Sequence, residues 1–488
     1  MEGFDSPGST PGPNGDGLAG IPNIATIAAT RLTPYSPPMR ALNSHLPEAH
    51  RILTLAWPVM LTSLNWTLLQ ATDVAVVGWT GTDQAAALSA SRSITYVGFM
   101  IAFGLMTSIL VFVSRADGAG EMRRTGQLLH DGLLLGLILG VVSGTTMWVF
   151  ALPLLLGIGV EPHLAPAAAQ VVRIMALAFV PSLLNLAASF FLEGVSRPRR
   201  VMVVQLATIP FNAVLAWAWS GGHLGLPALG AVGATAATAV ASLVGAAGLI
   251  LAAWTLPDAA ARGVRDFGGR TIGSLFVGAA KLARFGLMPG VSSGLELSGI
   301  SILIALSTQL GEVTANAFQI VFAIHNLVFG IGMGFASAAG VRAGNAVGEG
   351  TPRAATPRAM VAVGLAFLFM GLFGVALIAF ADPASAIFAA TPQVHALATD
   401  MLRLWAPFIL LDGVQIVLLF TLRSLGDQVA AGFASITSFF LVTGGSGLLM
   451  VQWGWGPFAL VGALAAGMAC SVALLGARLA IVHRRLSL

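Results

Sequence analysis

Three acidic residues, Asp73, Glu296 and Asp412, stand inside long apolar stretches of the sequence. An ionisable side chain in a membrane-spanning helix costs at least about 2.5–3.5 kcal/mol, so such residues are functional candidates. A helical rise of about 1.5 Å per residue places Glu296 and Asp412 at similar depths, roughly 17 and 15 Å from one membrane face, with Asp73 nearer the other. We expect no basic residue at the depth of Glu296 and Asp412. A proton or a cation such as Na⁺ must then neutralise them, which is the chemistry of an ion-coupling site.

Uncharged polar residues share the helical faces of these carboxyls. Gln70 lies three residues before Asp73, and Gln415 lies three after Asp412, a spacing that brings side chains together on a helix. Each amide alone is more simply read as an interhelical hydrogen bond than as a ligand. Together they predict a polar cavity that a substrate could cross, lined by Gln70, Asn185, Gln319 and Gln415.

The composition excludes a water-soluble enzyme. Charged residues make up 9% of the 488 residues, against roughly 25% in a soluble domain, and 56% are hydrophobic. The mean hydropathy is +0.87. The single cysteine, Cys470, excludes an intramolecular disulfide and a cysteine-based metal cluster. No Gly-rich phosphate loop ending in Gly-Lys-Ser or Gly-Lys-Thr occurs, so we expect no catalytic residue, no cofactor and no nucleotide partner.

The elements that must position the three carboxyls are helices that span a bilayer. A bilayer core about 30 Å thick requires roughly 20 apolar residues per helix. Twelve such stretches occur, at 52–78, 91–113, 128–152, 167–193, 203–220, 231–255, 285–310, 314–340, 359–381, 398–422, 429–451 and 458–482. The other seventeen acidic residues are predicted to lie in loops, at helix ends or in the tails. We therefore expect an all-α polytopic membrane protein with twelve transmembrane helices.

The basic residues predict the orientation of these helices. With the N-terminus inside, 21 of the 24 Lys and Arg residues fall in cytoplasmic segments, as the positive-inside rule requires. Both termini are then cytoplasmic, in a bacterial-type inner (plasma) membrane. Because the arginines are spread over seven segments rather than gathered on one face, no nucleic-acid partner is expected. The expected partner is the lipid bilayer, and the expected state is a monomer.

The two halves of the sequence repeat each other at a nearly constant separation, slightly less than half of the chain. Pro58 corresponds to Pro289, Arg173 to Arg403, and Pro227 to Pro457. Six spans per half is an even number, so both halves enter the membrane from the same side, a parallel arrangement known among secondary transporters. The repeat predicts two six-helix lobes. Their boundaries are a disordered cytoplasmic tail at 1–48, an N-lobe at 49–255, a cytoplasmic linker at 256–284, a C-lobe at 285–482 and a cytoplasmic tail at 483–488, with Met39 as an alternative start of translation.

Several motifs together resemble the multidrug and toxic compound extrusion (MATE) family, and its NorM-like branch in particular, over about residues 48–482. They are Ala56-Trp57-Pro58, Asp73 with Val77-Gly78, Ser114-Arg115-Ala116, Glu296, Gln319, Arg342 with Gly348-Glu349, Asp412 with Gln415, and Leu422 to Asp427. The resemblance implies an inner-membrane antiporter that exports small-molecule drugs or metabolites in exchange for Na⁺ or H⁺. These partners are varied and often cationic and amphipathic. By the same resemblance, Glu296 and Asp412 bind the coupling cation, which makes them the candidate Na⁺ ligands, and Asp73 handles protons or substrate in the N-lobe.

One position departs from the family pattern. Sodium-coupled relatives tend to carry a tyrosine one turn before the last of these carboxyls, whereas this chain has Phe408. The loss of a hydroxyl ligand favours H⁺ over Na⁺ and leaves Phe408 as a candidate for the substrate pathway.

Three other classes compete with this interpretation. A lipid-linked oligosaccharide flippase and a major-facilitator transporter also have two lobes, but flippase cavities tend to be richer in basic residues. A receptor or scaffold is the alternative from a different class, and it would leave three intramembrane carboxyls without a purpose.

Overall fold

The computed structural model describes residues 41–266, 268 and 270–487, and the expectations for residues 1–40, including the start at Met39, lie outside them. Twelve helices of the described part are long and apolar enough to cross a membrane, as predicted. The described residues contain no strand. The sequence forms helices throughout because its apolar stretches are apolar on every face, and in lipid each backbone N–H and C=O must be satisfied within its own segment.

Six spanning helices come from the first half of the chain. They are α2 (Ala41–Gly78), α3 (Thr82–Gly118), α4 (Met122–Gly157), α5 (Ala165–Gly194), α6 (Pro198–Gly221) and α7 (Gly230–Trp254). A short helix, α8 (Ala259–Arg262), follows in the connection to the second half.

The second half supplies six more spans, two of them interrupted. The other four are α9 (Ile272–Gln309), α10 (Glu312–Gly348), α11 (Ala355–Ala386) and α16 (Phe458–Ser487). Helix α11 follows the 3₁₀ turn η2 (Pro352–Ala354) and is kinked at Phe380, whose backbone is not helical. The tenth span consists of α12 (Pro392–Trp405), a 3₁₀ turn η3 (Ala406–Phe408) and α13 (Ile409–Ser424). The eleventh consists of α14 (Gln428–Ser435), a π-helix η4 (Ile436–Thr443) and α15 (Gly444–Gln452).

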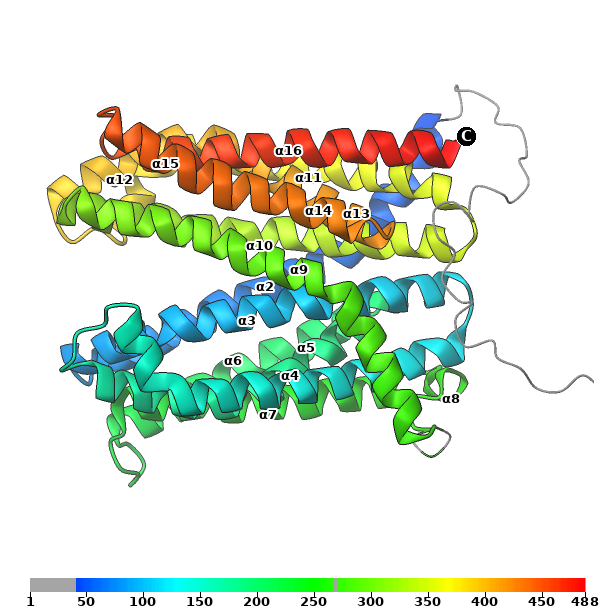
Figure 1. The fold of residues 1–488 in the computed structure, drawn as a ribbon, viewed down its shortest axis with the longest axis horizontal. Coiled ribbons are helices and arrows are strands. Elements are labelled where there is room, and N and C mark those ends of the chain that lie inside the picture. Colours follow the sequence, from blue (N-terminus) through cyan, green and yellow to red (C-terminus); the bar gives the residue numbers. More distant parts are fainter. Residues whose placement is uncertain (1–40, 267, 269, 488) are drawn as a thin grey trace, which may run out of the picture.

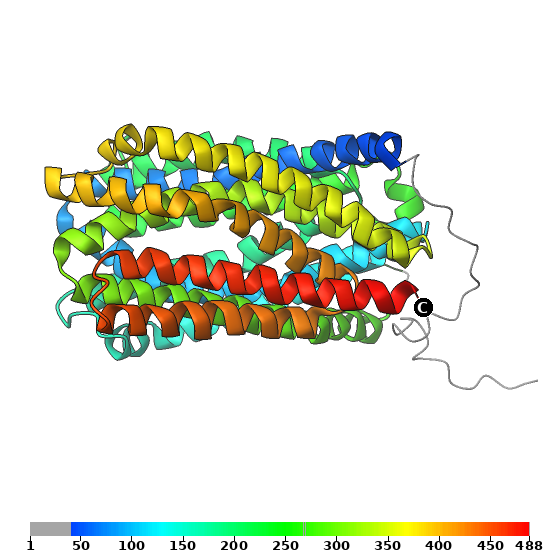
Figure 2. The ribbon, with the colours of Figure 1, turned by 90° about the horizontal axis from the view of Figure 1, so that it is seen from above.

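The helices form two bundles that lie one above the other in Figure 1. The lower bundle holds α3 to α7, and the upper one holds α10 to α16. Helix α9 crosses from the lower bundle at its start to the upper bundle at its end, and Figure 2 shows the helices running roughly along the long axis of the molecule. The start of α2 and the end of α16 lie at the same end of the bundle (Figure 1).

The internal repeat is visible in the positions where equivalent helices stop. Helix α5 ends at Gly194 and α13 ends at Ser424, the same separation in sequence as that of Arg173 and Arg403. Each helix is followed two residues later by a residue with positive φ, Ser196 at 61° and Gly426 at 89°. A positive φ is uncommon outside glycine, so its recurrence at Ser196 shows that both lobes use the same turn.

Most helices extend beyond the predicted spans, and three of them reach into segments that were predicted as tails or linker. Helix α2 begins at Ala41, inside the predicted 1–48 tail, α9 begins at Ile272, inside the predicted 256–284 linker, and α16 continues to Ser487. The apolar stretches mark only the part of each helix that lipid surrounds. Backbone hydrogen bonding continues past that boundary, so charged residues such as Lys281 and Arg284 are still helical.

The connection between the halves is fastened to the first lobe by Arg262. Its guanidinium lies 2.8 Å from Asp117 and 2.7 Å from Asp258, and it donates to Thr125 Oγ1 at 3.0 Å. Burial acts to raise the pKa of Asp258, but the hydrogen bond and charge of Arg262 outweigh it and leave that pKa lowered.

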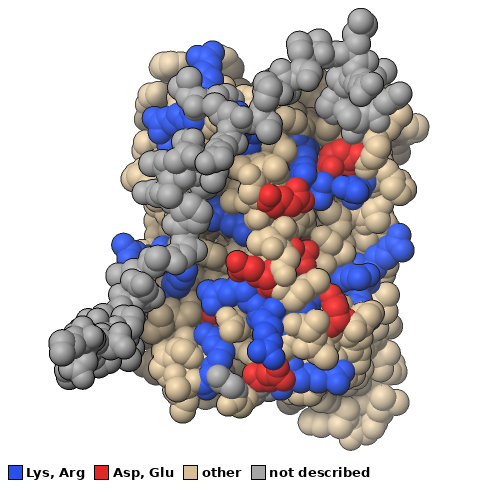
Figure 3. Space-filling view, turned by 90° about the vertical axis from the view of Figure 1, so that its right-hand side faces the viewer, with Lys and Arg blue, Asp and Glu red and all other residues tan. Residues whose placement is uncertain are grey.

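The end of the molecule that carries these connections is rich in basic residues. Figure 3 shows Lys and Arg side chains spread over this face with Asp and Glu between them. We call it the arginine-rich end. It holds the last turn of α3 with Arg115, the loop before α6 with Arg197, the 255–271 connection and the last turn of α16.

Candidate functional site

Asp412 lies in the first turn of α13, just after the 3₁₀ turn that interrupts the tenth span. Its side chain is only 3% exposed. Gln415, one turn further along, donates from Nε2 to Asp412 Oδ1 at 3.2 Å. The Ser471 hydroxyl of α16 donates to Gln415 Oε1 at 3.3 Å, which fixes the orientation of the amide. The predicted Asp412–Gln415 neighbours are therefore in contact.

A histidine that the sequence did not single out faces Asp412. His325 of α10 is 7% exposed, and its Nδ1 lies 3.9 Å from Asp412 Oδ2. Its ring is held among Phe322, Phe329 and Trp405, with ring centroids 5.3 to 6.1 Å away. The expectation that no basic residue lies at this depth was therefore wrong, because a histidine within an apolar helix carries no signal of its partner.

Glu296 occupies the neighbouring helix α9 and is half-buried. Its charge interacts with Asp412 and with Arg423, a basic residue that the sequence placed at the cytoplasmic side. Tyr96 of α3 lies close enough to Glu296 for an electrostatic interaction. Within the described part of the chain, Glu296 has no hydrogen-bond partner. It is thus the more accessible of the two carboxyls and faces a side chain of the other lobe.

Asp73 lies in a separate network inside the N-lobe. Its Oδ1 accepts from Asn212 Nδ2 at 3.4 Å, and its Oδ2 accepts from Thr238 Oγ1 at 3.1 Å. Arg92 Nη2 lies 3.8 Å from Oδ2 and also donates to the Gln70 carbonyl. The carboxyl is therefore paired with a cation, a partner that the sequence did not predict.

The other residues predicted for the substrate pathway lie in separate parts of the molecule. Asn185 accepts from Gln205 Nε2 at 2.6 Å, in a network that also includes Asn65. Gln319 is exposed and lines a pocket of about 310 Å³ near the start of α10, together with residues of the loop before α12. Phe408 is half-buried at the end of the 3₁₀ turn, one helical turn before Asp412.

The repeat relates these polar clusters to one another. Asn65 and Glu296 are separated by the same interval as Pro58 and Pro289, and Asn185 precedes Gln415 by the interval between Arg173 and Arg403. The N-lobe thus has a neutral amide where the C-lobe has the carboxyl of Glu296. The two lobes place polar side chains at equivalent depths, but only the C-lobe places two acids together there.

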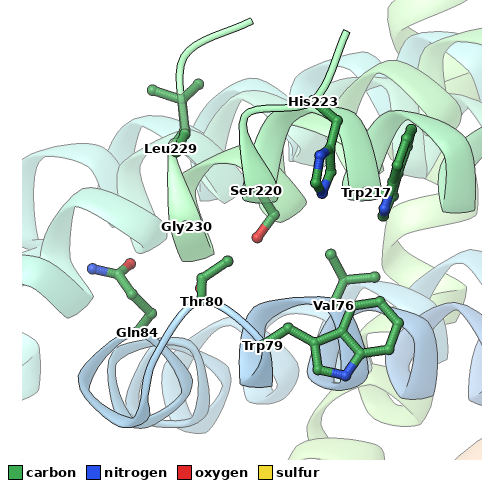
Figure 4. A pocket seen from close by; sticks show the side chains of 11 residues that line it. Val76, Trp79, Thr80, Gln84, Trp217, Ser220, His223, Leu229 and Gly230 are labelled. Carbon is green, nitrogen blue, oxygen red and sulfur yellow. The ribbon is translucent and has the colours of Figure 1, made fainter.

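A pocket of about 480 Å³ opens at the end of the N-lobe opposite the arginine-rich end (Figure 4). Trp217 stacks on His223 with ring centroids 4.2 Å apart, and Trp79 lies across the pocket. The buried Ser220 hydroxyl has no hydrogen-bond partner among the described residues. None of the predicted site residues lines this pocket, and its lining carries no Asp, Glu, Lys or Arg.

The backbones of the two lobes come into close contact. These contacts lie in the region that extends from the middle of the molecule to the arginine-rich end. A Cβ on Gly104 would lie 2.5 Å from the Pro289 carbonyl oxygen, and one on Gly348 would lie 2.0 Å from that of Arg115. Glycine is required at such approaches because any side chain would collide.

Polar links join the lobes at the same end. Arg115 donates from Nη2 to the Ser424 carbonyl at 2.8 Å, Asn345 donates to the Ser114 carbonyl at 2.9 Å, and Arg342 pairs with Glu48 at 2.6 Å. A fourth link runs from the Ser337 hydroxyl to Glu193 Oε2 at 2.6 Å. The prediction that all acids other than the three candidates lie near water was wrong, because Glu193 and Asp131 are also buried.

No group of three or more His, Cys, Asp or Glu side chains that could hold a metal ion occurs in the described ranges. The donors around Asp412 are largely nitrogen groups, the Gln415 amide and the His325 ring. Such groups suit a proton better than a hard cation, which prefers a cage of oxygen ligands.

Twelve spanning helices in two repeated lobes, with carboxyls buried in each, define a two-lobe membrane transporter. The MatE family model matches residues 58–218 and 290–444, more than half of the chain, and the chain belongs to this family. The predicted resemblance to the MATE family is thereby confirmed.

Curated relatives and solved structures agree with this assignment. The chain is 30% identical to a probable multidrug resistance protein NorM of Deinococcus radiodurans over 83% of this chain and 88% of the relative. It is 25% identical to the multidrug resistance protein PmpM of Pseudomonas aeruginosa over 90% and 92% of the two chains. The eukaryotic MATE transporter AtDTX14 shares the fold, with a TM-score of 0.81 at 19% identity over 91% of this chain and 98% of that one.

Proposed function

We propose that this protein is a multidrug exporter of the inner membrane that exchanges cationic or amphipathic small molecules for protons. It works as a monomer by alternating access, with the arginine-rich end and both termini in the cytoplasm. Names of relatives such as NorM and PmpM support multidrug export. The mechanism needs no catalytic residue, cofactor or nucleotide, because the ion gradient supplies about 2.3 kcal/mol per charge for each 100 mV.

The buried Asp412–His325 pair is the observation that carries the choice of proton over Na⁺. The carboxyl receives an amide N–H from Gln415 and faces an imidazole nitrogen at 3.9 Å. Phe408, one turn earlier, has no oxygen to offer to a cation. Na⁺ at Glu296 and Asp412 is the alternative, and it would require oxygen ligands from outside this set.

Exchange follows from the way the lobes meet. The lobes touch through the half that includes the arginine-rich end, which supports a state that is closed toward the cytoplasm and open to the other side. Protons that enter from outside, one for each carboxylate, neutralise Asp412 and Glu296 and weaken their attraction for a cationic drug. Coupling requires this difference in affinity between the two states. Asp73, which is paired with Arg92, is the carboxyl that handles protons or substrate in the N-lobe.

Transport by the purified protein in liposomes tests the proposal. We expect drug export driven by a pH gradient with no sodium present, and no export driven by a sodium gradient at clamped pH. Export driven only by sodium would overturn the choice of the proton as coupling ion, but the assignment as an exporter would stand. If neither gradient drives any tested cationic drug, the exporter assignment itself fails.

A further inference from the structure

The pocket of about 480 Å³ at the end of the N-lobe is a cavity that the proposed exchange does not use. It lies where α2 and α6 end and where α3 and α7 begin. Its volume falls within the range of small-molecule sites, about 300–1,000 Å³. Its walls combine the aromatic rings of Trp79, Trp217 and His223 with the hydroxyls of Thr80 and Ser220 (Figure 4). Aromatic walls with a few polar groups are typical of sites that bind small organic molecules.

Ser220 carries the clearest sign that the pocket receives a ligand. Its side chain is 0% exposed, and its hydroxyl has no hydrogen-bond partner among the described residues. Serines of the neighbouring α3, such as Ser91 and Ser93, instead donate to the carbonyl three residues earlier. A buried hydroxyl without a partner is unfavourable. Figure 4 shows the Ser220 oxygen pointing from α6 toward the space in front of α2, where an oxygen of a ligand can bind it.

The aromatic side chains provide surfaces for a flat ligand. Trp217 and His223 are stacked with an interplanar angle of 18°, so each ring holds the other in place. Trp79 lies across the pocket and is 76% exposed (Figure 4). A planar aromatic compound can pack against such rings in offset or edge-to-face arrangements. Among the described residues, the His223 ring nitrogens have no hydrogen-bond partner, so the imidazole offers a second polar group to a ligand.

The pocket suits an uncharged ligand. Its lining contains no Asp, Glu, Lys or Arg, and a buried charge without a counter-charge is unfavourable. The nearest intramembrane carboxyl on its helices is Asp73, one turn before Val76 of the lining. That carboxyl is 6% exposed and is occupied by Arg92, Asn212 and Thr238. It therefore leaves no free charge for a cation in the pocket.

One wall of the pocket depends on a glycine. Gln84 Oε1 accepts a hydrogen bond from the Ala231 N–H at 3.0 Å, which joins the start of α7 to the start of α3. A Cβ on Gly230 would lie 2.4 Å from that oxygen, and Gly230 has a φ of +56°. Glycine therefore meets both requirements, the close approach of Gln84 and the left-handed backbone. The pocket is thus held open by specific contacts between its helices.

The repeat shows that the fold alone does not require the polar base of the pocket. By the interval between Pro227 and Pro457, the residue that corresponds to Ser220 is Met450 of the C-lobe. Its sulfur lies 3.4 Å from the place that a Cβ on Gly462 would take, so this apolar side chain packs against the next helix. The N-lobe has an unpaired hydroxyl at the same position, which points to a role beyond packing.

We propose that this pocket is a binding site for uncharged aromatic compounds that carry a carbonyl or hydroxyl oxygen. The ring of the ligand packs between Trp79 and Trp217, and its oxygen binds the Ser220 hydroxyl and the His223 ring. The site is separate from the carboxyls that serve the cationic drug and the proton. It therefore takes a chemical class that the proposed exchange does not include, and its binding can be measured without any ion gradient.

Equilibrium dialysis with coumarin tests the site. Coumarin is uncharged and flat, and it carries a lactone carbonyl. The full-length protein in lipid nanodiscs is compared with empty nanodiscs, which corrects for coumarin that dissolves in the lipid. We expect saturable binding of one coumarin per protein. Coumarin-3-carboxylate, the anionic analogue, should bind at least tenfold more weakly because the pocket has no cation to pair with it.

Variants of the lining locate the bound coumarin. Trp217→Ala should weaken binding by about tenfold or more, whereas Trp148→Ala, an exposed tryptophan outside the pocket, should leave it unchanged. Ser220→Ala should weaken it by roughly two- to tenfold. Ala228→Phe fills the pocket from the exposed loop between α6 and α7 and should abolish binding. Leu226→Phe, in the same loop but outside the lining, is its control.

The cation tetraphenylphosphonium separates this site from the drug pathway. We expect it to leave coumarin bound, and we expect Ala228→Phe to leave its own binding unchanged. The proposal fails if coumarin shows no saturable binding, or if Trp217→Ala and Ala228→Phe proteins with the melting temperature of the parent bind it normally. It also fails if tetraphenylphosphonium displaces coumarin and loses affinity in Ala228→Phe, because the pocket would then belong to the cation pathway. None of these results depends on whether the protein exports drugs.

Discussion

At the scale of single residues, the acids were visible in the sequence and their basic partners were not. Asp412 stands out because a charge within an apolar run is rare, and its contact with Gln415 follows from helical spacing. His325 and Arg92 become meaningful only when other helices bring them within 4 Å of Asp412 and Asp73. Glu193 escaped notice because it stands at the predicted edge of its span, where an acid normally reaches water.

Asp412→Asn tests the residue most deeply built into the C-lobe site. The amide keeps the shape of the side chain but cannot exchange a proton, so we expect drug resistance of a sensitive host to fall to the level of the empty vector. Asp400→Asn, an exposed position of the same span, is the matched control and should retain full resistance. The comparison requires equal amounts of both variants in the membrane. Full resistance from Asp412→Asn would remove this residue from the mechanism.

At the scale of elements, periodicity and length located every span, but not their irregular parts. The π-helix at Ile436–Thr443 adds a residue to one turn, and no composition signal marks it, since the segment is as apolar as its neighbours. Its wide turn packs against α9 near the Glu296 site, where Gly299 faces the Phe439 carbonyl. The contact between these elements fixes the position of the carboxyl and could not be derived from either sequence alone.

Gly299→Ala should disturb this contact. A Cβ there would lie 2.1 Å from the Phe439 carbonyl oxygen, so the helices must move apart, at a cost of about 1–3 kcal/mol. We expect a lower melting temperature in detergent and slower export. Gly476→Ala has no atom within 4 Å of its new Cβ and should leave the melting temperature unchanged or slightly higher. Equal melting temperatures for the two variants would contradict the close packing described here.

At the scale of the whole molecule, the repeat predicted two lobes related by a constant shift in sequence, and the ends of α5 and α13 confirm that shift. The arrangement of the two lobes relative to each other could not be predicted, because a sequence repeat does not show where the two copies touch. That information lies in pairs such as Gly104 with Pro289 and Gly348 with Arg115, which are remote in sequence. The extension of α9 from Ile272 into the predicted linker likewise became clear only from its packing on the first lobe.

Gly348→Ala should act on the arrangement of the lobes rather than on either lobe alone. Its Cβ would meet the Arg115 carbonyl at 2.0 Å only while the lobes are joined. A penalty of about 1–3 kcal/mol corresponds to a rise of roughly 5- to 150-fold in the population of the parted state. In a Cys470→Ser background, Ser114→Cys places a thiol in this contact, since Ser114 is buried against Gly344 of the other lobe. Its alkylation by a maleimide should therefore accelerate by that factor. Gly364→Ala, which has no atom within 4 Å, should leave the rate unchanged, and an unchanged rate in Gly348→Ala would show that this seam does not open.

The proline inside α9 gives this helix the properties of a lever. Pro289 has no N–H for the carbonyl of Phe285, so the helix can bend there at little cost. The segment before Pro289 is clamped to the first lobe by the contact of Gly286 with Leu105, and Glu296 stands seven residues beyond the fulcrum. A change of about 20° in this bend would swing Glu296 through roughly 3–4 Å at the end of an arm of about 10 Å. That travel is the length of a hydrogen bond, so a small tilt of one lobe is enough to engage or release the carboxyl without unfolding any turn of the helix.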